Sequence, residues 1–103
     1  MRTLNIIENA EFNDISMKKQ MVNKGSSFYI LNFNLKKGQE LPLHHRDIDG
    51  ELAIYIIEGE GVFLKEDGTS PAKKGEILIG NIREPHGLRA HTDMIAIAAV
   101  TPH

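Results

Sequence analysis

Short runs of β-branched, aromatic and aliphatic residues alternate with glycine-containing or charged turns along the chain. The clearest run is 26–35, where Tyr29, Leu31, Phe33 and Leu35 recur at a period of two residues, as on the buried face of a strand. No stretch sustains a helical apolar period over three turns. The pattern predicts further strands at 4–7, 15–22, 41–45, 51–57, 62–65, 76–79, 86–90 and 94–100. So many short strands predict an all-β sandwich or barrel, and closing an antiparallel barrel also removes exposed sheet edges.

Length and composition narrow the class of protein. A chain of 103 residues with 41% hydrophobic and 25% charged residues is expected to form one globular domain. Without cysteine, neither disulfides nor thiolate metal ligands are available. The net charge of −2 comes from interspersed signs, which argues against a nucleic-acid partner, and no segment has the roughly 20 apolar residues of a membrane span. The first residues lack the features of a secretion signal, so a cytoplasmic location is expected.

Two segments carry the candidate chemistry. The first, 38–59, contains the run His44-His45-Arg46 and then Glu51 ahead of a hydrophobic strand; the second, 75–90, contains His86 directly after a proline. Imidazole and carboxylate ligands suit iron, manganese, nickel or zinc, and an open site of this kind can polarise a substrate oxygen.

Together the two segments resemble the two conserved motifs of the cupin superfamily. In motif one, a glycine is followed after five residues by histidine, a second histidine two positions on, then glutamate and glycine. Gly38, His44 and Glu51 match this spacing, and the interval from Gly75 to His86 matches motif two. The resemblance covers about half of the chain and implies a single-domain jelly-roll (double-stranded β-helix) barrel over residues 1–103.

The resemblance also implies a function class. A cupin at these positions would bind a divalent transition metal, and the candidate ligands are His44, His45, Glu51 and His86. We expect such a protein to bind or act on a small polar or carboxylate-bearing metabolite at the barrel centre. If it is an enzyme, the resemblance implies a metal-dependent oxygenase or isomerase. Cupins include enzymes, binding proteins and storage proteins, so the fold by itself leaves the reaction unassigned.

The sequence departs from the family pattern at chemically important positions. Arg46 occupies the place of the second motif-one histidine, and counting back from Gly59 puts Leu52 where the glutamate is expected. In motif two, the proline, glycine and asparagine of the pattern are replaced by Asn81, Arg83 and Ala90.

These departures leave two geometries open. On a regular strand, His44 and His45 face opposite sides, so an inward His44 brings Arg46 into the barrel as a fixed cation that can pair with Glu51. A β-bulge would instead let both histidines reach one point, and a bulge before Gly59 would return the glutamate to the interior.

Three functions remain open. The first is the metal-dependent cupin; the second is a non-catalytic small-molecule binding module in which Arg46 replaces the metal; the third is a barrel that serves only as a scaffold for association. Arg46 and Tyr55 are the candidate substrate-binding residues, although Tyr55 also fits a core or subunit-interface position. His91 and His103 are expected to be exposed.

A homodimer is also expected. The outward face of 51–57 carries Ala53, Tyr55 and Ile57, which is more apolar than a solvated face should be. The strands predicted near the N-terminus offer edges that a second subunit could cover.

Overall fold

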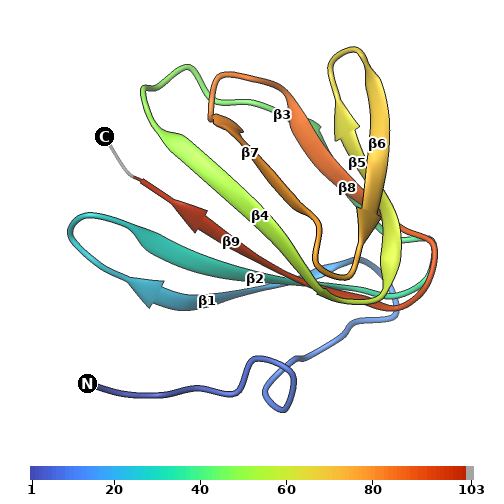
Figure 1. The fold of residues 1–103 in the computed structure, drawn as a ribbon. Coiled ribbons are helices and arrows are strands. Elements are labelled where there is room, and N and C mark those ends of the chain that lie inside the picture. Colours follow the sequence, from blue (N-terminus) through green and yellow to red (C-terminus); the bar gives the residue numbers. More distant parts are fainter. Residues whose placement is uncertain (102–103) are drawn as a thin grey trace.

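A computed structural model describes residues 1–101, and strands are its only regular secondary structure (Figure 1). His103 therefore lies outside the described residues, while His91 is exposed as expected. No helix long and apolar enough to cross a membrane is present in residues 1–101. The nine strands of this part of the chain are β1 (Lys18–Lys24), β2 (Tyr29–Leu35), β3 (Glu40–His44), β4 (Glu51–Glu58), β5 (Glu60–Lys65), β6 (Gly68–Lys73), β7 (Ile77–Asn81), β8 (His86–Ala90) and β9 (Met94–Val100).

The strands form two antiparallel sheets that lie against each other (Figure 1). One has five strands in the order β1-β2-β9-β4-β7, and the other has four in the order β3-β8-β5-β6. The predicted all-β class is confirmed. Strands that are far apart in sequence, such as β2 and β9, are hydrogen-bonded neighbours, so the barrel is built from long-range pairings.

The core fills the space between the sheets. Period-two alternation places Leu52, Ile54 and Ile56 of β4 inward, and Leu88 of β8 meets them from the opposite sheet. Each of these side chains is at most 6% exposed, and fully burying one contributes roughly 1.5–3 kcal/mol. The inward positions predicted for β2 are also correct, because Phe33 and Leu35 are buried there.

Two predictions about strands are wrong. Residues 4–7 form no strand: a turn begins at residue 6, and the N-terminal arm containing it lies along β1 and β2. Side chains hold this arm: the buried Asn34 donates from Nδ2 to the Glu11 carbonyl oxygen at 2.9 Å. Strand β6 was not predicted, because Gly68 and Pro71 are residue types that are uncommon in strands. Proline is tolerated there because β6 is an edge strand.

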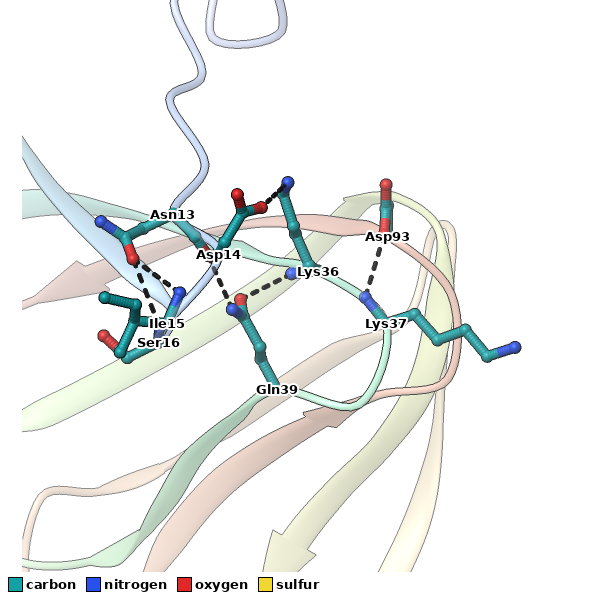
Figure 2. A network of polar contacts seen from close by, with 8 residues as sticks. All are labelled: Asn13, Asp14, Ile15, Ser16, Lys36, Lys37, Gln39 and Asp93. Atoms are coloured by element: carbon teal, nitrogen blue, oxygen red, sulfur yellow. Dashed lines mark hydrogen bonds and ion pairs between the residues drawn. The ribbon is translucent and has the colours of Figure 1, made fainter.

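The arm is also anchored at one end of the barrel (Figure 2). Asp14 forms an ion pair with Lys36, which lowers the pKa of Asp14, and Gln39 donates from Nε2 to the Asn13 carbonyl oxygen at 2.7 Å. Nearby, the Lys37 N–H donates to Asp93 Oδ1 at 2.9 Å. These contacts join the β2–β3 and β8–β9 turns, so they tie down the barrel end where β2 finishes and β9 begins.

The outer face of the five-stranded sheet is apolar over its neighbouring strands β9, β4 and β7. Pairing aligns two uncharged rows across the sheet, which are Ile30-Ala99-Ala53-Ile79 and Asn32-Ile97-Tyr55-Ile77. Ile79 is 71% exposed, Ile77 50% and Tyr55 40%. A contiguous exposed apolar patch of this kind marks an interaction surface more often than a solvated one.

Candidate functional site

A cavity of about 550 Å³ opens between the sheets at the end of the barrel opposite the anchored arm. It lies where β2 and β4 begin and where β3 and β9 end, so both sheets contribute side chains. Most of its lining is apolar and includes Leu31, Phe33, Ile54 and Ile82. A volume in this range suits a small organic ligand.

A β-bulge determines which histidine enters this cavity. Leu41 pairs with Leu88 and His44 pairs with His86, so β3 uses one residue more than β8 between these two pairs. The extra residue turns both Leu41 and His44 inward, since without it their odd spacing would place them on opposite faces. Gly87 makes the bulge fit, because an ideal Cβ there would lie 2.6 Å from the Leu41 carbonyl oxygen.

The bulge brings two imidazole rings together. The rings of His44 and His86 lie with centroids 4.4 Å apart and planes tilted by 56°. His44 Nδ1 lies 2.8 Å from the Pro42 carbonyl oxygen, and His86 Nδ1 lies 2.8 Å from that of Glu84. A carbonyl oxygen only accepts hydrogen bonds, so each Nδ1 must carry the proton, and Nε2 holds the lone pair in the neutral ring.

The environment favours the neutral form of His86. Burial lowers the pKa of His86, the hydrogen bond to the Glu84 carbonyl opposes this shift, and the neighbouring His44 and His45 lower the pKa further. An uncharged ring at neutral pH is the state in which Nε2 can accept a hydrogen bond or bind a metal.

Arg46 lines the same cavity as the histidine pair. It does so although β3 ends at His44, and the Arg46 N–H donates to the Ile82 carbonyl oxygen at 3.2 Å. Within residues 1–101, no ion pair engages its guanidinium group, so the pairing with Glu51 that one of the two geometries allowed is not formed.

Sequence reasoning missed three polar residues of this cavity. Lys19, Lys24 and Tyr29 line it from the β1–β2 hairpin. A second bulge, between Met21 and Asn23, brings Lys24 opposite Tyr29, so simple alternation along β1 would not have placed both lysines on one face. The period-two pattern of β2 did predict the inward direction of Tyr29.

Other candidate residues lie outside the cavity. Leu52 lines it, so Glu51 at the start of β4 faces the other way and is exposed. The bulge predicted before Gly59 is present between Ile56 and Glu58. Because β4 alternates regularly before that point, the bulge does not turn Glu51 inward. His45 faces away and lies 3.6 Å from Asp47, measured from Nε2 to Oδ1.

Tyr55 is also separated from the cavity. It belongs to the outer face of the five-stranded sheet, between Ile97 and Ile77. Of the predicted site residues, the structure therefore brings together His44, His86 and Arg46 in one cavity. Tyr55, His45 and Glu51 lie on other surfaces.

A second cavity has acidic side chains in its lining. It has a volume of about 580 Å³ and includes Glu66, Asp67 and Glu84 in its lining. His86 forms part of both linings, so it lies between an acid-free cavity and an acidic one.

The positions of these side chains test the metal hypothesis. Catalytic zinc sites typically have three protein ligands. The positions equivalent to the four motif ligands hold His44, Arg46, Leu52 and His86, and only two of these side chains can bind a metal. In the described residues, no group of three or more His, Cys, Asp or Glu side chains is arranged to hold a metal ion. The described residues thus do not fit a complete protein-held metal centre.

The fold and cavity define a small double-stranded β-helix barrel with a polar end, and similar structures agree. The chain is similar to an RmlC-like cupin from Desulfovibrio desulfuricans, with 40% identity, a TM-score of 0.96, and coverage of 99% of this chain and 97% of that one. The chain belongs to the cupin superfamily. No family model and no curated protein sequence matches it.

More distant structures share the fold alone. A protein from Thermus thermophilus is 20% identical with a TM-score of 0.91, covering 99% of this chain and 98% of that one. An uncharacterised double-stranded β-helix protein from Klebsiella pneumoniae is 19% identical with a TM-score of 0.90, covering 99% and 90%.

Proposed function

We propose that this cupin binds a small carboxylate-bearing metabolite in the cavity between its sheets, with Arg46 in the place of a metal. One observation carries the proposal: the ionisable side chains in the lining are cations, imidazoles and one tyrosine, and no Asp or Glu is among them. Positive side chains without negative ones in the lining favour an anionic ligand over a neutral or cationic one.

Arg46 is the best placed of the cations. Its planar guanidinium can bind a carboxylate through two parallel hydrogen bonds, and no described acid competes for it. The apolar wall formed by residues such as Phe33 and Ile54 would cover the rest of the ligand. Lys19 and Lys24 would add electrostatic attraction from the β1–β2 side of the cavity.

The test is calorimetric titration with 3-phenylpropanoate, whose carboxylate and ring match the two parts of the cavity, and with its uncharged amide. We expect Arg46→Met to weaken binding of the acid about ten- to a hundredfold, because a hydrogen bond to a charged group contributes about 1.5–3 kcal/mol. The matched control is Arg83→Met, which removes an arginine already paired with Asp49 at 3.1 Å outside the cavity. Equal binding of acid and amide, or equal effects of the two substitutions, would refute the proposal.

A second candidate function is metal binding through His44 and His86. The observation that favours it is the matching pair of Nδ1 hydrogen bonds to backbone carbonyls, because metal-binding histidines usually donate their other N–H in this way. The remaining ligands would then come from a bound metabolite or from water. Elemental analysis of untagged protein tests this: stoichiometric metal that is lost in His86→Ala and retained in His91→Ala would support it, and metal-free wild-type protein would exclude it.

A further inference from the structure

The polar groups of the cavity are unequally divided between donors and acceptors. Arg46, Lys19 and Lys24 only donate hydrogen bonds. The acceptors are Nε2 of His44 and Nε2 of His86, together with the Tyr29 hydroxyl, which can do either. A carboxylate satisfies the donors and leaves the two imidazole acceptors without a partner.

The two acceptors lie close together and in fixed orientations. Each ring is held through Nδ1 by a carbonyl oxygen two residues earlier in its own chain segment, and the ring centroids are 4.4 Å apart. No described residue hydrogen-bonds to Nε2 of either ring. Arg46 follows His44 by two residues, which separates their backbones by at most roughly 7 Å, and both line the cavity, so one small ligand can span the cation and the imidazole pair.

From this arrangement we infer that the ligand is a hydroxylated carboxylic acid with an apolar body, whose single hydroxyl proton is shared by Nε2 of His44 and Nε2 of His86 in a three-centre hydrogen bond. The inference rests on the proposed function, since it assigns the carboxylate to Arg46 and adds a second recognition element. A site built to bind a hydroxyl group discriminates against an analogue lacking it, because the site's own polar groups then lose their partner.

The test compares 3-phenyllactate with 3-phenylpropanoate, which differ by a single hydroxyl group. We expect wild-type protein to bind 3-phenyllactate roughly tenfold more tightly. His86→Phe and His44→Phe should each reduce the ratio of the two affinities, because each substitution removes an imidazole acceptor from the cavity. His91→Phe, at an exposed histidine outside the cavity, should keep the full preference.

The outcomes separate the inference from the proposed function. If both acids bind wild-type protein equally well, the acceptor role of the histidines is overturned and the carboxylate site survives. If neither acid binds, both fail. The comparison in wild-type protein does not depend on the folding of any variant. Each titration is repeated with EDTA, and a preference that disappears with the chelator would show that a metal, rather than the imidazole lone pairs, recognises the hydroxyl group.

Discussion

Gly87 of β8 should be indispensable for the geometry of the site. An alanine there would place its Cβ 2.6 Å from the Leu41 carbonyl oxygen and 3.0 Å from both Leu43 N and the Pro42 carbonyl carbon. Ordinary contact begins near 3.4 Å, and all three atoms belong to the β3 backbone, which cannot rotate away as a side chain can. The bulge that turns His44 inward must therefore move.

The size of the effect follows from two opposing contributions. Overpacking of this kind costs about 1–3 kcal/mol, whereas Gly→Ala favours folding by about 0.4–1 kcal/mol because it restricts the unfolded chain. We expect a net destabilisation of about 1–2 kcal/mol, which corresponds to a Tm lower by about 10 °C in a domain of this size. Because His44 moves with the bulge, preference for 3-phenyllactate should fall as well.

Thermal unfolding followed by circular dichroism measures the first effect, and calorimetric titration of the folded variant measures the second. Gly38→Ala is the control: that glycine has φ of +86° and nothing within 4 Å of an added Cβ, so alanine is strained there without touching the site. It should cost about 1–2 kcal/mol and leave ligand binding unchanged. A Gly87→Ala protein with wild-type stability and wild-type ligand preference would refute the reasoning.

Two further predictions concern pH and assembly. Because burial lowers the pKa of His86 below its usual value near 6.5, the unfolded chain takes up the proton first, so stability should decrease as pH falls through that value toward the lowered pKa. Urea unfolding at pH 8 and pH 5 should show a lower free energy of unfolding at pH 5, and His86→Phe should make this difference smaller. A difference of the same size in His86→Phe would contradict the attribution to His86. We also predict that a second copy covers the outer face of β9, β4 and β7, since two uncharged faces meet without burying an unpaired charge. Light scattering should give twice the 11.5 kDa chain mass for wild-type protein and for Ile15→Glu, whose side chain is 92% exposed on the N-terminal arm, but a monomer for Ile79→Glu. A monomeric wild type, or dissociation by both substitutions, would exclude this interface.

Local patterns in the sequence were sufficient for the fold class and for most strands. Alternation in 26–35 predicted the inward direction of Tyr29 and Phe33, because a strand exposes successive side chains on opposite faces whatever its neighbours are. The spacing from His44 favoured Glu51 as a ligand and the spacing from Gly59 put Leu52 at that position; the cavity is lined by Leu52, so the choice of Glu51 was wrong.

The composition of the site depended on tertiary structure. Bulges in β1 and β3 insert one residue each, and a shift of one residue exchanges the two faces of a strand. The inward direction of Lys24 and His44 therefore cannot be predicted from their spacing in the sequence. A bulge forms only where the neighbouring strand leaves room for it, as Gly87 does for β3. The sequence by itself determined that histidines, an arginine and a glutamate come near one end of the barrel. Packing between β3 and β8 decided that His44 and Arg46 face inward and that His45 does not. The physical reason is that only a paired neighbour fixes the register of a strand.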